Sequence, residues 1–323
     1  MKRIASFRRA VLAMIACFAF AAQAQTYPNK PLRIIVGQSA GGGIDTLARL
    51  AAQKMTESLG QPVVVENKPG AGGIIGTAFV TKAPPDGYTL LMAPIGNMVF
   101  TQILYTKLPY SAQHDLTPIS MLATFPLILV VNASQPYRTV RELVAYMKAN
   151  PDKANYGGSG PAFQFATELF KIKTDTKAQF IQYKSTSEVI TALIAGDLLL
   201  ALADTGPAHE PVAGGRLRAL AVTSPLRLPS LPDVPTMAEV GLPELEVQFW
   251  VGLFAPTGTP QPIVKKLEAE LIRIAGLPEI AKRMTSIQVS PVGSSGEEFA
   301  KVLAADLARW SAVAKAADIK PND

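Results

Sequence analysis

The sequence has few of the side chains that attack substrates or bind metal ions. It contains one cysteine, Cys17, and two histidines, His114 and His209. The histidines are far apart in the chain and show no H-E-x-x-H spacing, so neither indicates a metal site. Ser159 lies in GGSGPAF, which lacks the second glycine of a G-x-S-x-G nucleophile elbow. We therefore expect no catalytic residues, no metal and no cofactor.

Long apolar runs are absent after the first residues of the chain. The apolar stretch 11–22 follows four basic residues and ends in the tripeptide A-Q-A, which is the order of parts in a secretory signal peptide. This predicts export and cleavage after Ala24. A transmembrane anchor and a lipid anchor on Cys17 are the alternatives, but the run is shorter than the roughly 20 residues that a span needs.

An excess of positive charge is also absent once the signal is removed. Cleavage takes away four basic residues, so Lys+Arg falls from 31 to 27 against 25 Asp+Glu and the formal charge falls from +6 to +2. Nucleic acids and anionic membranes are bound by clustered basic surfaces. We therefore expect neither as a partner. Cys17 leaves with the signal, which predicts a protein without disulfides.

The 299 residues after the signal show an alternation of strand and helix patterns. This order is typical of α/β proteins with parallel sheets, and the length exceeds what one core usually fills, so we expect two lobes. The first series has strands at 32–36, 63–65 and 88–92 and helices at 45–59 and 74–82. The second series has strands at 127–131, up to 156, 179–183, 198–203 and 217–222 and helices at 140–149, 162–171 and 187–195.

Two extended apolar stretches, 122–131 and 247–255, lie where one series ends and the next begins. Two crossings between lobes imply a hinge. A helix led by Pro262 would then return to the first lobe, followed by helices near 278–284 and 297–316. The expected division is 1–24 signal peptide, 25–125 with 249–323 as domain 1, and 126–248 as domain 2.

The glycine-rich stretch GQSAGGGIDTLARL joins the first strand to the first helix. In open parallel sheets, ligands bind beyond the carboxyl ends of the strands. The first N–H groups of a helix are unpaired and carry partial positive charge, which attracts anions, and glycines let a ligand approach the backbone. A tight turn is the alternative. The expected ligand-binding residues here are Ser39, Ala40, Gly41, Gly42, Gly43, Ile44 and Asp45.

Asp45 has two alternative roles in this loop. It can pair with Arg49 one turn further along the helix and favour the helix start electrostatically. If it faces the ligand instead, it would accept a hydrogen bond from an ammonium or hydroxyl group.

A second glycine-rich exit from a strand, NYGGSGP, leads into the helix after Gly160. Pro161 fits the first helical position, and the donors would be the amides of Ala162 and Phe163 with the hydroxyl of Ser159. Neither loop contains Lys or Arg, so an anion would be held mainly by backbone amides, which favours carboxylates. A ligand touching both loops would favour lobe closure.

Four longer stretches carry a resemblance over nearly the whole chain after the signal: YPNKPLRIIVGQSAGGGIDTLAR, VVVENKPGAGGIIGTAFVTKAPPDGYTLLM, LRALAVTSPLRLPSLPDVPTMAEVGLP and FWVGLFAPTGTPQPIVKKL. They resemble the Bug family of periplasmic solute receptors of tripartite tricarboxylate transport systems. The resemblance implies a two-domain Venus-flytrap fold, type II-like, with two mainly parallel sheets flanked by helices and joined by two crossover strands. It also implies a periplasmic protein that binds a carboxylate between its lobes.

The resemblance carries further implications for the site and the partners. An aspartate is common in the family at the position of Asp204, which makes this residue a pocket candidate, with a helix cap or solvated loop as the alternative. The implied partners are a small carboxylate ligand and either the membrane permease subunits of the transporter or a sensor kinase. We expect a monomer that is not an enzyme.

The second loop departs from the family pattern in presenting Pro161, Ala162, Phe163 and Phe165. A more apolar mouth would favour an aromatic or otherwise bulky carboxylate, although Phe165 at helical spacing is better interpreted as a core residue. The ligand class therefore includes di- and tricarboxylates, acidic amino acids and aromatic carboxylates. An exported hydrolase that uses Ser159 and His209 is the alternative function.

The stretch KPGAGGIIG resembles some dinucleotide fingerprints through Gly70, Gly72 and Gly76. A dinucleotide site, however, has its glycine turn after the first strand of the sheet. We therefore expect these glycines to serve packing rather than NAD binding.

Overall fold

The computed structural model describes residues 27–321. The expected signal peptide, its cleavage site and Cys17 lie outside the described residues. Within 27–321, no helix is both long and apolar enough to cross a membrane.

The first lobe is built on three parallel strands, as the alternating pattern predicts. Strand β1 (Leu32–Val36) lies between β2 (Val63–Asn67) and β3 (Thr89–Pro94). Strand β1 is almost continuously apolar and buried because α2 (Gly43–Leu59) and α3 (Ile74–Thr81) cover the sheet.

Among the glycines of KPGAGGIIG, Gly76 serves the packing of this lobe, as expected, whereas Gly72 has a φ of +63° and a Cβ on it would meet no atom within 4 Å. A Cβ on Gly76 would lie 2.8 Å from the Cα of Gly37, at the end of β1, and 3.0 Å from the carbonyl oxygen of Lys68. Only glycine permits this close approach of α3 to the strand ends.

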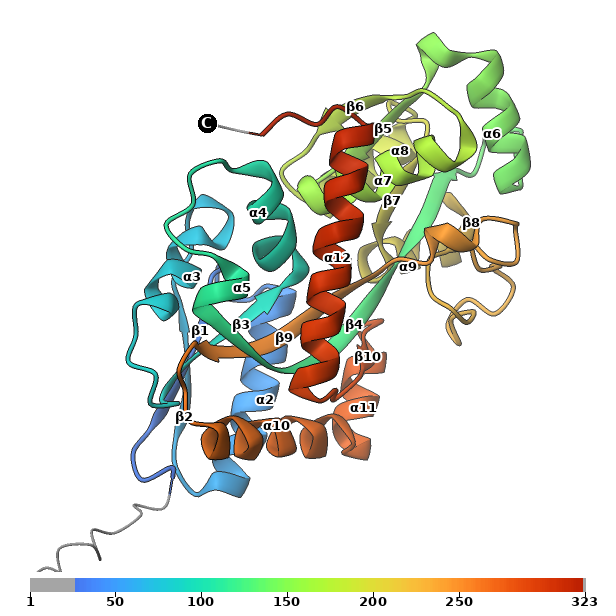
Figure 1. Ribbon diagram of the computed structural model, residues 1–323. Helices are drawn as coiled ribbons and strands as arrows, with labels where there is room; N and C mark the ends of the chain where they lie inside the picture. The colour runs from blue at the N-terminus through green and yellow to red at the C-terminus, as the bar shows by residue number, and fades with distance from the viewer. Residues whose placement is uncertain (1–26, 322–323) are drawn as a thin grey trace, which may run out of the picture.

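Two long strands join the lobes (Figure 1). Strand β4 (Leu116–Asn132) pairs with β9 (Gln248–Pro256) through Pro126 and with β7 (Ala201–Asp204) and β8 (Leu217–Val222) from Leu127 onward, all antiparallel. The expected crossing 122–131 is therefore part of one continuous 17-residue strand. Its change of partners is a tertiary feature that the local sequence pattern does not carry.

The second lobe combines parallel and antiparallel pairs. Strands β5 (Asn155–Gly158) and β6 (Gln179–Gln182) are parallel to each other, while β7 and β8 flank β4. Its helices are α6 (Val140–Ala149), α7 (Pro161–Thr174), α8 (Thr186–Ala195) and α9 (Thr205–Ala213). The sequence reading missed α9, since Pro211 inside it is unfavourable in a helix interior.

The chain then returns to the first lobe. Helix α10 (Gln261–Ala275) packs on β4 and α2, and α11 (Pro278–Thr285) leads to the two-residue β10 (Ser290–Pro291) at the edge of β4. Helix α12 (Gly296–Ala316) starts at a capping box formed by Ser295 and Glu298. It runs past the crossing strands from the first lobe to α7 of the second (Figure 1).

The remaining short segments connect these elements. They are η1 (Ala71–Gly73), η2 (Gly96–Phe100), α4 (Thr101–Leu104), α5 (Ala112–Asp115), η3 (Pro151–Lys153) and η4 (Pro243–Leu245).

Candidate carboxylate site between the lobes

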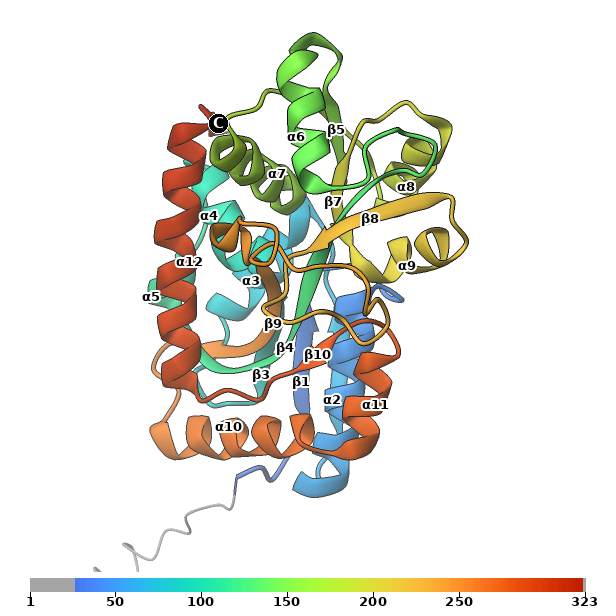
Figure 2. The ribbon, with the colours of Figure 1, turned by 90° about the vertical axis from the view of Figure 1, so that its right-hand side faces the viewer.

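A cavity of about 510 Å³ lies between the two lobes. Figure 2 shows its surroundings: α9 of the second lobe lies above the upper end of α2, on one side of the crossing strands. The walls are mainly apolar with a few polar groups, which is typical of small-molecule sites. The cavity is lined by Gly41, Gly43, Ile44, Thr46, Leu47, Phe125, Asp204, Thr205, Gly206, Pro207, Ile287, Gln288 and Val289.

The start of α2 brings backbone donors to this cavity. Gly42 is the N-cap and provides no side-chain cap, and the first helical bond runs from the Thr46 amide to the Gly42 carbonyl at 2.9 Å. Among residues 27–321, no backbone acceptor pairs with the amides of Gly43 and Ile44. These two N–H groups, at the positive end of the helix dipole, are available to an anion.

The three consecutive glycines have different reasons to be there. Gly41 has a φ of +83°, which side-chain-bearing residues rarely adopt. Gly42 and Gly43 have no such backbone requirement, and a Cβ on Gly43 would meet no atom within 4 Å. The fold therefore does not require glycine at position 43. The absence of a side chain there leaves open space beside the cavity.

Asp45 is held inside the loop by three groups. Its Oδ2 accepts hydrogen bonds from the Arg49 Nε and the Gly41 amide, both at 2.9 Å, and its Oδ1 accepts one from Asn67 at 3.0 Å. The Arg49 bond, with smaller contributions from Gly41 and Asn67, lowers the pKa of Asp45 to about 2. The side chain is only 3% exposed and lines no part of the cavity.

These contacts change two expectations for the first loop. The pair with Arg49 is present, and it favours the positioning role of Asp45 over contact with a ligand. The Gly41 amide was expected among the ligand donors, but it is already bonded to the Asp45 carboxylate. Ser39, Ala40 and Gly42 are exposed near the cavity without lining it.

Asp204 lies at the cavity wall contributed by the second lobe. It is the N-cap residue of α9, and its Oδ2 accepts a hydrogen bond from the Thr186 hydroxyl at 3.1 Å. Thr186 in turn lies 3.1 Å from the hydroxyl of Ser159. Burial raises the pKa of Asp204 to about 6, against a smaller lowering by Thr186. Protonation of this carboxyl below about pH 6 would remove its repulsion of an anionic ligand.

The second glycine-rich loop does not line this cavity. Ser159 connects to it only through Thr186 and Asp204, and Gly160 and Ala162 contribute no lining atoms. Phe163 is half-buried and packs edge-on against Phe249, with ring centroids 5.9 Å apart.

Phe165 is fully buried and belongs to the core, as its spacing predicts. Neither Phe163 nor Phe165 lines this cavity, so the cavity gives no support to an apolar mouth formed by these two rings. The apolar walls of the cavity come from other residues, among them Phe125 of β4.

Several residues that line the cavity between the lobes were not predicted from the sequence. Thr205, Gly206 and Pro207 form the first turn of α9, and a helix start after Asp204 was the signal that could have found them. The turn at 287–289 between α11 and β10 has no glycine to mark it. Phe125 reads as an ordinary strand residue.

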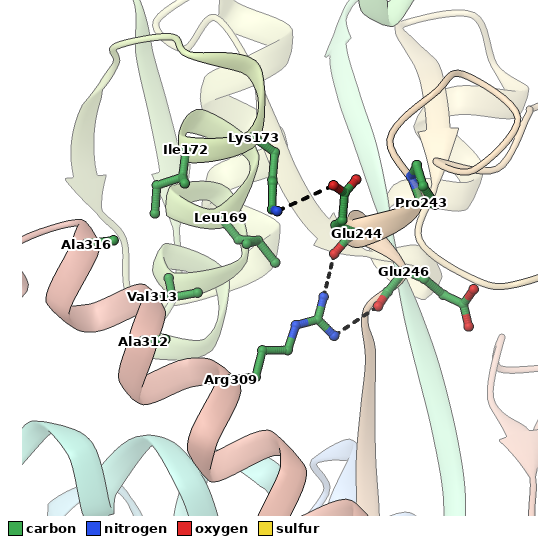
Figure 3. Close-up of a pocket in the computed structure, with 10 residues that line it drawn as sticks. All are labelled: Leu169, Ile172, Lys173, Pro243, Glu244, Glu246, Arg309, Ala312, Val313 and Ala316. Atoms are coloured by element: carbon green, nitrogen blue, oxygen red, sulfur yellow. Dashed lines mark hydrogen bonds and ion pairs between the residues drawn. The ribbon is translucent and has the colours of Figure 1, made fainter.

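A second hollow of about 520 Å³ lies on the other side of the crossing strands, between α7, η4 and α12 (Figure 3). The charged groups of Arg309, Lys173 and Glu244 already have partners. Arg309 donates to the carbonyl oxygens of Glu244 at 2.6 Å and Glu246 at 3.1 Å, and Lys173 pairs with the Glu244 carboxylate at 3.4 Å. Within residues 27–321, no α-helix begins among its lining residues, so the cavity at α2 and α9 is the better candidate.

The side chains considered for the hydrolase alternative, Ser159 and His209, have other neighbours in the structure. The Ser159 hydroxyl lies 3.1 Å from the Thr186 hydroxyl. The Nδ1 of His209 lies 3.9 Å from the carboxylate of Glu210. Within the described part of the chain, no three His, Cys, Asp or Glu side chains are grouped so as to hold a metal ion.

The sequence matches a known family. The model for the tripartite tricarboxylate transporter family receptor covers residues 47–319. The chain is 33% identical to protein BugT of Bordetella pertussis over 295 residues, 90% of each chain. It is 34% identical over 302 residues to a UPF0065 protein encoded in the tcbD-tcbE intergenic region of Pseudomonas sp. strain P51, with 93% of this chain and 90% of the relative covered.

Solved structures agree with this match. A Rhodopseudomonas palustris protein solved with adipate has a TM-score of 0.79 at 32% identity, with 92% of this chain and all of that chain covered. MatC from Rhodopseudomonas palustris, solved with bound malate, has a TM-score of 0.74 at 30% identity, with 89% and 99% covered.

These relatives are solute receptors rather than enzymes, so the hydrolase alternative is not favoured, and they share the two-lobed mixed α/β fold described above. The chain belongs to the tripartite tricarboxylate transporter family of periplasmic receptors.

Proposed function

We propose that this protein captures a small carboxylate with an apolar body in the cavity between its lobes. The observation that carries the proposal is that two helix starts, those of α2 and α9, meet at one cavity from opposite lobes. The amides of Gly43 and Ile44 supply donors from the first lobe, and those of Thr205 and Gly206 supply donors from the second. A ligand bound to both sets favours the closed arrangement of the lobes by its differential affinity.

The binding strength would come from charge-assisted hydrogen bonds and apolar contact. Each amide bond to a carboxylate contributes about 1.5–3 kcal/mol. The lining contains no Lys or Arg, so the amides hold the charge without a cationic partner. The side chains of Ile44, Leu47 and Phe125 suit a hydrocarbon body between or beside the carboxylates.

The relatives with adipate and malate support a dicarboxylate as the first ligand to test. Asp204 distinguishes diacids that lack a hydrogen-bond donor from acids that carry a hydroxyl or ammonium group. An unsubstituted diacid requires Asp204 to be protonated, whereas a hydroxyl or ammonium group can donate to the ionised carboxylate. Tricarboxylates, acidic amino acids and aromatic carboxylates belong in the same test.

The ligand-binding set proposed from the sequence is retained with altered roles. Gly43, Ile44 and Asp204 are contact residues, and Asp45 and Gly41 shape the loop. Ser159, Gly160, Ala162 and Phe163 belong to the second lobe behind Asp204, where Ser159 supports it through Thr186.

We infer the cellular role from the family. Export through the signal at 1–24, with cleavage after Ala24, would deliver the receptor to the periplasm. There the loaded protein would meet the permease subunits of a tripartite tricarboxylate transporter, with a sensor kinase as the other candidate. The change of β4 partners at Pro126 and Leu127 supports domains at 25–125 with 249–323 and at 126–248. We propose that the receptor acts as a monomer.

A binding screen tests this proposal. Purified protein is heated with citrate, malate, adipate, aspartate, glutamate, nicotinate or terephthalate, each in excess. A true ligand raises Tm in proportion to the logarithm of its concentration, and mass spectrometry recovers it unchanged. If no acid raises Tm or binds in calorimetry, the proposed function is wrong; consumption of the acid would point to an enzyme instead.

A further inference from the structure

The turn after α11 has an unusual backbone. Gln288 has a φ of +61°, in a region where glycine is the usual residue at a helix end. The Gln288 amide donates to the Thr285 carbonyl and the Val289 amide donates to the Met284 carbonyl, both at 3.0 Å. This is the hydrogen-bond pattern of a Schellman motif. Gln288 occupies a left-handed backbone position where glycine is usual, which points to a function for its side chain.

That turn faces the second lobe across the cavity. Ile287, Gln288 and Val289 line the cavity from the first lobe, and Gly206 lines it from the second. A Cβ on Gly206 would lie 3.6 Å from the Ile287 carbonyl oxygen. The lobes therefore approach each other here, beside β4, whose Phe125 lines the same cavity.

A side-chain hydrogen bond joins the lobes at this approach. The Ser230 hydroxyl donates to the Gln288 Oε1 at 2.6 Å. Ser230 belongs to the long connection between β8 and η4, which extends toward α11 in Figure 2. The bond to Ser230 uses the Gln288 Oε1. Among residues 27–321, no partner is found for the side-chain nitrogen Nε2, so this group can still donate.

The connection that carries Ser230 is held in place within its own lobe. Arg227 pairs with both carboxylate oxygens of Glu239, at 3.0 and 2.9 Å, and donates to the Pro232 carbonyl at 3.0 Å. Glu239 also accepts from the Thr236 amide at 2.7 Å. Ser230 is thus presented by a preorganised loop.

We propose that Gln288 is a positioning residue for closure of the carboxylate site. It forms part of the outer wall of the cavity, and its bond to Ser230 keeps the second lobe over a bound ligand. This inference rests on the proposed function, because it assigns a further residue to that same site. A ligand whose capture requires closure then dissociates more slowly when this bond is present.

The test compares Gln288→Gly and Ser230→Ala with the unaltered protein, using adipate, malate, citrate, aspartate and terephthalate. Glycine suits the left-handed turn, so Gln288→Gly should keep the Tm of the ligand-free protein unchanged or raise it by up to about 2 °C. The same variant should weaken binding about three- to tenfold, mainly through faster dissociation. Ser230→Ala should weaken binding similarly.

The double variant and a control decide the interpretation. Because the two side chains act through one bond, combining Gln288→Gly with Ser230→Ala should cost less than the product of the single effects. Ser286→Ala, which removes a hydroxyl bonded to the Arg283 carbonyl outside the cavity, should leave binding unchanged. Undiminished affinity in Gln288→Gly, or effects that simply multiply, would overturn the inference. If the unaltered protein binds none of the acids, the proposed function itself fails.

Discussion

Individual residues of the first loop separate what the fold needs from what a ligand needs. Gly41 is required by its backbone conformation, and Asp45 fixes it through the amide bond at 2.9 Å. Gly43 has neither constraint, although it lines the cavity. The sequence predicted this loop as the site, because a glycine run between a strand and a helix is a local pattern. The sequence did not reveal that the Gly41 amide donates to the Asp45 carboxylate, because this bond depends on the position of the folded side chain.

Gly43→Ala tests the role of open space at the start of α2. Alanine is favoured over glycine in a helix, by up to about 1 kcal/mol in the interior, so the ligand-free Tm should stay the same or rise. Its methyl group occupies space beside the donors, so we expect affinity to fall about tenfold or more in calorimetry. Gly60→Ala at the left-handed C-cap of the same helix is the opposite control, with a lower Tm and unchanged affinity. Equal affinity of Gly43→Ala and the unaltered protein would remove Gly43 from the site.

Asp204 predicts a pH dependence of binding. Its pKa is raised to about 6 by burial, so the carboxyl is mostly protonated at pH 5 and mostly ionised at pH 7.5. For a diacid without a donor group, such as adipate, affinity should follow the protonated fraction of Asp204 and fall roughly thirtyfold over this interval. Calorimetry at a series of pH values measures the fall, and Asp204→Asn should flatten it.

The same group affects folding with the same sign. Between about pH 4 and 6 the folded state retains a proton that the unfolded state loses, so this contribution to stability decreases as pH rises. His209→Gln, a substitution on α9 outside the lining of the cavity, serves as the control. A pH profile that Asp204→Asn leaves unchanged, while His209→Gln flattens it, would assign the effect to the imidazole of His209 and contradict the role given to Asp204.

At the scale of elements, the periodicity of the sequence was sufficient for most helices and strands. The parallel order of β1, β2 and β3 and the helices between them follow from local patterns. Two features did not. Helix α9 contains Pro211 and was missed, and with it the helix start at the second wall of the site. The second glycine loop looked like the partner of the first, but tertiary packing brings α9 to the cavity instead.

Helix α12 packs against β4 and α7 and acts as a brace: we expect it to stabilise the folded protein by holding these elements together. Arg309 donates to the Glu244 and Glu246 carbonyls (Figure 3), so Arg309→Ala leaves two acceptors without this partner. We expect a loss of about 1–3 kcal/mol in the free energy of unfolding, measured in urea. Lys301→Ala, which breaks an exposed pair with Glu297, should cost less than about 0.5 kcal/mol. A loss for Arg309→Ala no larger than for Lys301→Ala would show that α12 is not a brace.

At the scale of the whole molecule, the proposed function requires that the two lobes close by bending at the crossing strands. The chain has two tryptophans, and both lie at this joint. Trp250 on β9 and Trp310 on α12 are each 1% exposed, and the Trp250 Nε1 donates to Asp306 at 2.7 Å.

Tryptophan emission should therefore report closure. Adding a true ligand should change the emission of Trp250 or Trp310 along a saturable curve with the same Kd as calorimetry, although neither ring lines the cavity. Trp250→Phe identifies which ring responds. Full binding with unaltered emission in both rings would argue for a rigid site that does not use the hinge.

The whole-molecule prediction also depends on where the ligand lies, and a crystal structure with the tightest-binding acid tests this most directly. Our account predicts one carboxylate within about 3 Å of the Gly43 and Ile44 amides, contacts to α9 and Asp204 on the other side, and the bond between Ser230 and Gln288 in place. A ligand bound outside this cavity, or one that leaves the first amides of α2 without an anionic partner, would contradict the account.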